Sequence, residues 1–528
     1  MEETILSNGR VLTMDAHGRE AEAALVRGNR IAAVGSNAEV RAQAGAGAKQ
    51  IDLAGRTLIP GFNDNHIHLV NMADRERTPS LFGLSKAEII EHIRASYPDA
   101  AAGEWLVGTQ WDYPHCPDPH VSDLDTAFPD HPVALFQFSG HAAWMNSRAF
   151  TELGITPQTP DWDRGGVDVD AQGRLTGILR EPFGAPGLRD LFQKRFTDPE
   201  NMRRNLPGAL AHLNRNGVTS VQDNTWFPHV MDVYNELYAG GGLTVRLSCW
   251  FMGDSQKLVA GMEDKEFHPS YVERGPLKYF LDGAFSSRTA WLTEPYAGEP
   301  NNYGAGIPVD DIVRFLEPAV RARRQVASHA IGDRATREYL DAAERLVERY
   351  PHLREMRIRI EHGQLISDAD IRRIVDLGFH VATQPHAAAT PQKDIELVGR
   401  ERALRAYPYR SLIDAGAQIS FGSDYPGEGS FEPLLGIHYV VNREGPEAIT
   451  PAEALRAYTI GSAYAQFAES EKGSIEPGKL ADLAVLSDDP TRIDPAGIKN
   501  IDVELTMTDG EIVYESSSMR APAPHGAG

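Results

Sequence analysis

Short apolar runs that read as buried strands alternate with helical segments through most of this 528-residue chain, and this alternation constrains the fold most. The pattern is typical of parallel α/β folds, because each parallel strand needs a crossover helix to return the chain. Ten strand candidates are visible. The first ends in His66-Ile67-His68, and nine follow it: 105–110, 133–138, 218–223, 244–251, 277–281, 325–329, 357–361, 380–384 and 418–423.

Ten strands are two more than an eight-stranded barrel needs. The two extra candidates, 105–110 and 133–138, lie in a segment at about 72–210 that is rich in proline, tryptophan and histidine. We therefore predict an α/β fold, a (β/α)8 TIM barrel with a long insertion after its first strand. Helices are expected before five of the later strands, at 204–215, 310–323, 333–350, 367–377 and 408–415.

The two ends of the chain read as short strands and turns. Neither 1–58 nor 470–515 is long enough to bury a good core alone, so we expect them to pair into one small, discontinuous β-sandwich domain. The barrel and its insertion then occupy 59–469. The tail at 516–528 has little to pack and is expected to be mobile.

Charge and cysteine content exclude some classes of function. The chain has 74 acidic and 52 basic residues, a net charge of −22, and such a field repels phosphate backbones. We therefore expect no nucleic-acid partner. The two cysteines, Cys116 and Cys249, suit a reducing compartment. The N-terminus does not read as a signal peptide, and no apolar run approaches the roughly 20 residues of a membrane helix, so we expect a cytoplasmic protein without a membrane partner.

The His-x-His sequence at the end of the first barrel strand indicates a metal site. Side chains alternate along a strand, so His66 and His68 point to the same face. Two surface histidines beside a turn would give the same sequence. Further ligands must therefore come from other strands.

Four later strand positions supply these ligand types. In a TIM barrel the chemistry lies at the C-terminal ends of the strands. Each residue alone also fits a structural role, as a satisfied core histidine or a lysine with a buried stem. Together with the two histidines they suit zinc-type coordination. The four are Lys278 in the fourth barrel strand, and His329, His362 and Asp424 at the ends of the fifth, sixth and eighth.

These residues lie in stretches that resemble the metal-dependent amidohydrolase superfamily, and more narrowly its branch of N-substituted formamide deformylase-like hydrolases. The resemblance covers nearly the whole chain. It is specific for the superfamily and says little about the substrate. The matching stretches are 58–68, 139–146, 217–223, 278–290, 329–335, 361–364, 422–426 and 473–486.

The resemblance implies a site for one or two divalent metal ions, most commonly zinc. Carboxylation of a lysine needs a neutral amine, and burial disfavours the charged form of a lysine. An unmodified lysine would favour a single metal. The implied roles are His66, His68 and Asp424 on the more buried metal, His329 and His362 on the second, and Lys278, carboxylated by CO2, as the bridge between them.

The resemblance also implies a homodimeric hydrolase that cleaves the C–N bond of a small amide, such as an N-substituted formamide or another N-acyl amine. A metal-activated hydroxide attacks the carbonyl. Asp424 acts as general base and then returns the proton to the leaving amine.

Four residues are candidate substrate contacts. The alternative for His141 is an ordered loop histidine, and for Arg288 an ion pair with Asp282. The tryptophans of the insertion suit either a cap over an apolar group or the insertion's own core. The four candidates are His141, Trp144, Arg288 and Gln384.

Other functions use the same scaffold. A deaminase would carry a glutamate three residues after the fifth-strand histidine, but His329 is followed by Ala330-Ile331-Gly332-Asp333. A lactone or ester hydrolase would use the same metals and stays open. A non-catalytic binding module would have lost some ligands, whereas all six positions are filled here.

Overall fold

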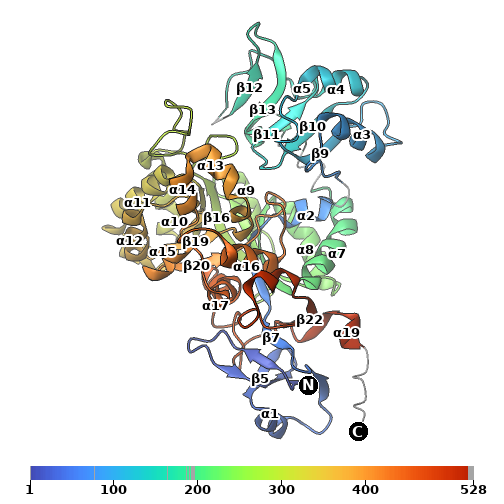
Figure 1. Cartoon of the computed structure of the whole chain (residues 1–528), viewed down its shortest axis with the longest axis vertical. Coiled ribbons are helices and arrows are strands. Elements are labelled where there is room, and N and C mark those ends of the chain that lie inside the picture. The colour runs from blue at the N-terminus through green and yellow to red at the C-terminus, as the bar shows by residue number, and fades with distance from the viewer. Residues whose placement is uncertain are drawn as a thin grey trace.

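The computed structural model describes residues 2–75, 78–162, 165–185, 187–188, 191 and 197–520. Three bodies follow one another along its long axis (Figure 1): an α/β insertion at one end, a barrel in the middle, and β-sheets from the two ends of the chain at the other. The barrel therefore contacts both of the other bodies.

Eight parallel strands form the barrel sheet, and each pairs with the next in chain order. Between the last strand and the first, the backbone N–H of Asp424 donates to the carbonyl of His66 at 2.6 Å, and that of His68 donates to Tyr425 at 3.0 Å. These hydrogen bonds complete the predicted (β/α)8 barrel. Its strands are β8 (Phe62–Ile67), β14 (Val218–Trp226), β15 (Arg246–Met252), β16 (Val272–Phe280), β17 (Val326–Ala330), β18 (Arg359–His362), β19 (His380–Thr383) and β20 (Gln418–Phe421).

Amphipathic helices cover the outside of the barrel (Figure 1). In α10 (Val309–Arg321), Ile312, Leu316, Ala319 and Val320 recur at helical spacing on one buried face. No helix among the described residues is long and apolar enough to cross a membrane. The other helices around the barrel include α8 (Pro228–Ala239), α9 (Gln256–Glu263), α11 (Asp333–Val347), α12 (Asp368–Leu377), α13 (Pro391–Val398), α15 (Tyr409–Asp414) and α16 (Pro433–Asn442).

The insertion after the first strand is a body with its own sheet, in the order β12-β13-β11-β10-β9. Apolar side chains fill two clusters in it, one around Trp111 and Leu135 and the other around Phe136 and Phe150. It therefore has its own core. Its elements are α3 (Lys86–Ser96), β9 (Leu106–Trp111), α4 (Val121–Ala127), β10 (Val133–Gln137), β11 (Ala142–Met145), α5 (Ser147–Leu153), β12 (Gly166–Val169) and β13 (Leu175–Arg180).

The insertion is shorter than the predicted 72–210. Helices α2 (Leu69–Arg75) and α7 (Pro199–Arg215) pack together within the barrel's hydrophobic core, so the insertion begins after residue 75 and ends before residue 199. The predicted helix at 204–215 began five residues too late. Its N-terminal signal is Asp198, whose side chain accepts a hydrogen bond from the N–H of Asn201 at 2.9 Å.

Strands from both ends of the chain share one six-stranded sheet, in the order β23-β22-β21-β7-β2-β3. A four-stranded sheet, β5-β4-β1-β6, packs on it through a shared apolar core, which makes a sandwich. The bounds are β1 (Glu3–Ser7), β2 (Arg10–Leu12), β3 (Glu20–Ala21), β4 (Ala23–Arg27), β5 (Arg30–Gly35), β6 (Lys49–Asp52), β7 (Thr57–Pro60), β21 (Leu483–Leu486), β22 (Val503–Thr508) and β23 (Glu511–Glu515).

The chain continues beyond β23 into a short helix, α19 (Ser517–Arg520). Glu504 accepts hydrogen bonds from the hydroxyls of Ser516 and Ser518, and Met519 packs against the core of the sandwich. Residues 516–520 thus contact the sandwich, and the mobility of the tail at 516–528 stays a prediction. The rest of the predicted tail, 521–528, lies outside the described residues.

Candidate metal centre

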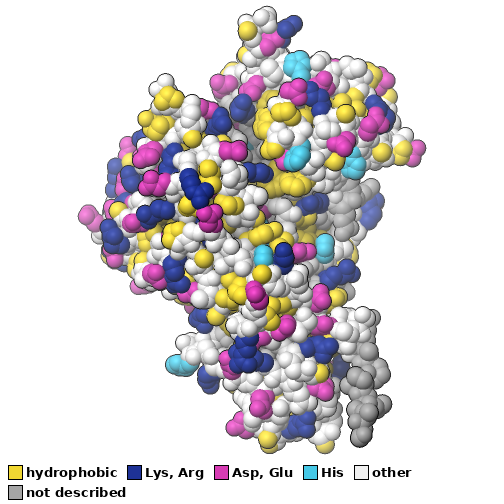
Figure 2. Space-filling view, in the orientation of Figure 1, with side chains coloured by type: hydrophobic (Ala, Val, Ile, Leu, Met, Phe, Trp, Pro, Cys, Tyr) yellow, Lys and Arg dark blue, Asp and Glu magenta, His cyan; other side chains and the backbone are white. Residues whose placement is uncertain are grey.

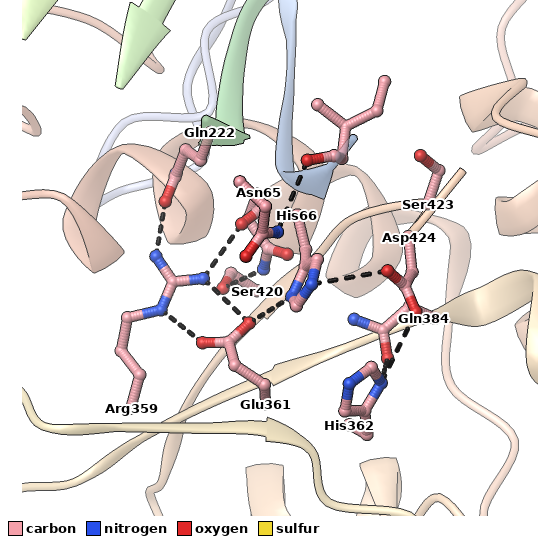
Figure 3. Close-up of polar contacts among 12 residues, drawn as sticks. Asn65, His66, Gln222, Arg359, Glu361, His362, Gln384, Ser420, Ser423 and Asp424 are labelled. Atoms are coloured by element: carbon pink, nitrogen blue, oxygen red, sulfur yellow. Dashed lines mark hydrogen bonds and ion pairs between the residues drawn. The ribbon is translucent and has the colours of Figure 1, made fainter. Parts of the chain in front are cut away.

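The predicted ligands lie at the C-terminal ends of the barrel strands. His66, His362 and Asp424 come together most closely, because one ligand atom of each lies within 4.8 Å of the other two (Figure 3). His66 comes from the first strand, and Asp424 follows the last. The closing hydrogen bonds of the barrel therefore bring the two halves of this cluster into contact.

His68 joins the same cluster. Its Nε2 lies 3.1 Å from Oδ1 of Asp424, and Nε2 of His66 lies 3.3 Å from the same oxygen. Both histidines of the His-x-His sequence thus face one carboxylate, as alternation along a strand requires. Trp226, at the end of β14, packs edge-on against His68 with ring centres 5.4 Å apart.

His329 and Lys278 line the adjacent part of the barrel interior. The ring centres of His329 and His362 are 4.3 Å apart, and Nε2 of His329 lies 3.0 Å from the carbonyl oxygen of Gly283. Lys278 is buried, with Nζ 4.9 Å from the centre of the Phe280 ring. That ring in turn contacts His329 at 5.4 Å. All six predicted ligands therefore lie in one region of the barrel.

The backbone is strained at two of these positions. φ is 72° at His362 and 53° at Asp424, both in the left-handed region that residues other than glycine rarely adopt. Such a conformation costs about 1–3 kcal/mol and persists only where the surrounding structure enforces it. Here it occurs at two strand ends whose side chains converge.

Burial and mutual contact shift the pKa values in this cluster. Burial lowers the pKa of His66 to about 4 and that of His362 to about 3, so both imidazoles are neutral at pH 7. Burial alone would raise the pKa of Asp424, but the neighbouring His66 and His68 hold it well below its ordinary value. Burial also lowers the pKa of Lys278 to about 8. At pH 7, His66 and His362 therefore offer neutral nitrogen ligands, and Asp424 offers an ionised carboxylate.

A fully buried ion pair lies behind His66 and was not predicted. Oε2 of Glu361 is 2.6 Å from Nδ1 of His66, and Nε of Arg359 donates to Oε1 of Glu361 at 2.7 Å (Figure 3). Arg359 also donates to the carbonyl of Asn65 at 2.9 Å and to the side-chain oxygen of Gln222. Burial alone would raise the pKa of Glu361, but Arg359 and His66 lower it to about 2.

This ion pair orients His66. Because Glu361 occupies Nδ1, the other nitrogen, Nε2, faces Asp424. A signal for the pair was present in the sequence. Arg359 and Glu361 alternate in a strand that is buried throughout, and buried charges rarely occur without a partner.

Two of the four predicted substrate contacts lie beside the cluster. Gln384 directly follows β19, and its Oε1 is 2.7 Å from Nδ1 of His362. His141, between β10 and β11 of the insertion, has its ring centre 6.1 Å from that of His329. Its Nδ1 lies 2.8 Å from Oε2 of Glu181. The insertion thus reaches the barrel next to the candidate ligands.

The insertion borders the barrel at a second point. Nζ of Lys393, on α13, lies 4.9 Å from the centre of the Phe138 ring. Phe82 packs 5.7 Å from Phe138 and is 54% exposed. Figure 2 shows apolar side chains along the junction between the insertion and the barrel. The insertion therefore supplies both polar and apolar side chains at the rim of the site.

The prediction of Trp144 as a substrate contact was wrong. Trp144 is fully buried, packs against Trp111 with ring centres 6.4 Å apart, and donates from Nε1 to the carbonyl of His120 at 3.0 Å. It belongs to the insertion's own core. An indole serves a core and a binding site equally well, so residue type alone could not separate the two.

Arg288 does not form the ion pair that was its predicted alternative role. It is half exposed and pairs with Glu299. Asp282 instead accepts backbone hydrogen bonds from Ile331 at 3.0 Å and Gly332 at 2.7 Å. Asp282 thus ties the end of β16 to the turn after β17, and Arg288 lies outside this connection.

Similarity to known proteins identifies the family of this chain. The model of the amidohydrolase family matches residues 49–514. The chain belongs to the amidohydrolase family. Among its relatives, the N-substituted formamide deformylase of Arthrobacter pascens is 31% identical over 98% of this chain and 99% of the relative. Protein LONG AFTER FAR-RED 3 of Arabidopsis thaliana is 30% identical over 92% of this chain and 87% of the relative.

Solved structures that resemble this amidohydrolase agree with the family identified from sequence. An uncharacterized metal-dependent hydrolase from Pyrococcus furiosus superposes with a TM-score of 0.74 and 28% identity, covering 94% of this chain and 100% of the other. The chain is accordingly a metal-dependent hydrolase of the amidohydrolase superfamily that acts on C–N bonds.

This amidohydrolase is expected to hold a divalent metal, and the residues present fit one. Imidazole nitrogens and a carboxylate oxygen are common ligands of such ions. His66, His362 and Asp424 offer them from a buried cluster, and the histidines are neutral at pH 7. The carboxylate–histidine contact between Glu361 and His66 is also typical of a metal-binding histidine.

Proposed function

We propose that this amidohydrolase uses zinc to hydrolyse the amide bond of a small N-acyl amine, with N-substituted formamides as the first class to test. The observation that supports it most is the position of Asp424, whose Oδ1 lies within 3.3 Å of Nε2 of both His66 and His68. A carboxylate there can act beside a metal. The formamide deformylase among the relatives suggests the substrate class.

Asp424 carries the proton in this mechanism. A bound divalent metal supplies Lewis acidity toward a water and a carbonyl. Asp424 is ionised at neutral pH, since its histidine neighbours offset the effect of burial on its pKa. Its position beside His66 and His68 is what would let it accept the proton of the attacking water. It then delivers that proton to the departing nitrogen. Glu361 and Arg359 keep His66 in place throughout.

Lys278 is proposed as the carboxylated bridge of a two-metal site. Carboxylation needs the neutral amine, and burial lowers the pKa of Lys278 to about 8, which raises the neutral fraction at physiological pH. Its Nζ lies against the Phe280 ring, which itself contacts His329, and this placement supports the role. Intact mass measurement of the metal-loaded protein, with and without added bicarbonate, tests for the 44-dalton adduct expected from the CO2 formula.

A deaminase reading is less well supported. Gly332 stands where a deaminase of this superfamily would carry its glutamate. The acid that follows it, Asp333, accepts hydrogen bonds from the backbone N–H of Thr293, at 3.0 Å, and from the Thr293 hydroxyl. It begins α11 rather than facing the cluster. Asp333 is thus committed to a structural contact.

The test pairs a substrate panel with two variants. Zinc-loaded protein is assayed on N-substituted formamides, N-acyl amines and lactones, and the formamides are expected to be cleaved fastest. Asp424→Asn is expected to keep its circular dichroism spectrum and lose about 10²–10⁴-fold in turnover. The matched control Asp333→Asn is expected to retain turnover. Near-normal turnover by Asp424→Asn at equal metal content would contradict the mechanism, and an equal loss in Asp333→Asn would show that the effect is not specific to Asp424.

The proposal also includes a cytoplasmic homodimer. Cys116 and Cys249 are both free and buried, which supports a reducing compartment. The dimer follows only from the resemblance. Light scattering on the purified protein tests it, and a monomer mass would contradict it.

A further inference from the structure

Gln384 is held deep in the barrel at the end of its seventh strand. It directly follows β19 and precedes the short 3-10 helix at Pro385–Ala389. Its side chain is 1% exposed. The chain turns immediately after it, so the position of the amide is determined by the strand and not by a mobile loop.

Only one end of this amide has a partner. Oε1 accepts a hydrogen bond from Nδ1 of His362 at 2.7 Å. Nε2 of Gln384 is buried and has no hydrogen-bond partner within the described part of the chain. An unpaired buried donor costs about 1–3 kcal/mol, so each one that persists needs an explanation.

The unpaired nitrogen faces the candidate metal centre. In Figure 3, Gln384 lies between His362 and Asp424, and its amide nitrogen points toward the space that His66, His362 and Asp424 enclose. The contact with Oε1 keeps a proton on Nδ1 of His362, and this nitrogen also lies 4.0 Å from Oδ2 of Asp424. The same contact directs the amide N–H groups of Gln384 into the site.

We propose that Gln384 is a catalytic residue that donates a hydrogen bond to the carbonyl oxygen of the substrate, and that it also positions His362. This inference deepens the proposed function and rests on it. When water attacks an amide carbonyl, the oxygen gains negative charge. A fixed N–H in a water-poor site then stabilises it more strongly than it stabilised the neutral carbonyl. Within the described residues, Nε2 of Gln384 has no hydrogen bond that it would have to break in order to bind the substrate.

Two substitutions separate the two roles. Gln384→Glu retains an acceptor for His362 and removes the N–H groups. Gln384→Met has a similar length and removes both contacts. Gln325→Met is the matched control, because Gln325 lies at the opposite end of the barrel strands, where it donates to the carbonyls of Arg357 at 2.9 Å and Ala465 at 2.8 Å.

We expect the Gln384 variants to lose kcat while KM changes little. Removal of one such donor lowers kcat by about 10²–10³-fold. Both Gln384 variants are expected to show it on the amide that the wild-type protein cleaves best. Metal content, measured by plasma mass spectrometry, is expected to stay at the wild-type level in Gln384→Glu and to fall in Gln384→Met. A purely structural role for Gln384 would lower thermal stability and metal content in both variants without this kcat effect.

A binding experiment tests the donor without turnover. Methylphosphonate carries negatively charged oxygens on a tetrahedral phosphorus, as the carbonyl carbon does when water has attacked it. Its affinity for the zinc-loaded protein is measured by calorimetry. We expect at least tenfold weaker binding by both Gln384 variants at equal metal occupancy, and unchanged binding by Gln325→Met. Equal affinity in the wild type and the variants, including no binding by any of them, would overturn the inference. If no amide is cleaved but the affinity difference appears, the proposed function fails and the donor role stands.

Discussion

The two halves of the candidate metal centre are held in place by different kinds of contact. On one side, Glu361 holds His66 and is itself paired with Arg359, and all three side chains are at most 1% exposed. On the other side, a backbone carbonyl, that of Gly283, contacts His329. We call the first the charged half, because a buried ion pair holds its histidine, and the second the neutral half, because an uncharged backbone group contacts His329.

The charged half of the centre is preorganised more than the neutral half. The charged half forms hydrogen bonds that include Gln222 and Asn65, so His66 is oriented without help from a metal. In the neutral half, Lys278 packs against the Phe280 ring, and its charge is disfavoured by burial. We therefore expect a first metal ion to bind at His66 and Asp424, and the other half to depend more on the metal.

The largest effect is expected from Arg359→Met, which leaves Glu361 buried without its cation. Breaking a buried ion pair from one side costs about 3–5 kcal/mol. Urea denaturation of the metal-free protein should show a fall of this size in the unfolding free energy.

The matched control for that change is Arg203→Met. Arg203 pairs with Glu236 through two hydrogen bonds, but both side chains are about half exposed. Exposed pairs contribute about 0–1 kcal/mol. Equal effects of the two substitutions would remove the distinction between the halves.

Lys278→Met, in the neutral half, is expected to raise the free energy of unfolding, whereas Arg359→Met lowers it. The pKa of Lys278 falls from its ordinary 10.5 to about 8, so its charge opposes folding at pH 7. One pKa unit corresponds to about 1.4 kcal/mol, and we expect Lys278→Met to stabilise the metal-free protein by about 1–3 kcal/mol.

The same lysine gives a pH dependence with a defined sign. Between pH 8 and 10.5 the unfolded chain holds a proton that folded Lys278 has lost, so this residue makes stability rise with pH across that window. The rise should be smaller in Lys278→Met. Urea midpoints at pH 7, 8, 9 and 10 measure it, and parallel profiles for the two proteins would contradict the burial of a charge there.

A smaller effect is expected for Glu361→Gln, which retains an acceptor for His66 but removes the negative charge. Loss of such a contact typically weakens metal binding about 10–100-fold. Competition with a chromophoric chelator measures it. Glu273→Gln is the control, since Glu273 lies near the start of β16 and accepts from Gln466 at 3.0 Å, away from the strand ends. Unchanged zinc affinity in Glu361→Gln would show that the charged half does not tune the metal.

Much of the fold was predictable because the barrel strands are apolar runs that end in polar residues. His329 and His362 mark where two such strands leave the barrel, and this spacing places the chemistry at one end. The sandwich followed from length, since neither end of the chain has enough apolar surface for its own core. The apolar runs and the polar residues at their ends were therefore enough to predict which residues form the cluster.

What the sequence did not reveal depends on contacts between distant segments. Glu361 and His66 are 295 positions apart, so their contact exists only once the barrel has formed. Trp144 could line a site or fill a core, and only the pairing of β11 with β10 and β13 shows that it is enclosed. The start of α7 was misplaced because its cap, Asp198, lies outside the apolar repeat.

The hydrogen bonds that close the barrel between β20 and β8 also bring together ligands that are synthesised at different times. His68 and Asp424 are 356 positions apart, and at about 5–20 residues per second a ribosome needs roughly 20–70 s to make that stretch. Throughout this time the His-x-His segment exists without its carboxylate. Metal binding by the cluster of His66, His362 and Asp424 therefore waits for the segment that carries Asp424. A nascent chain that stalls before Asp424 would carry the four candidate histidines but lack the carboxylate that His66 and His68 face.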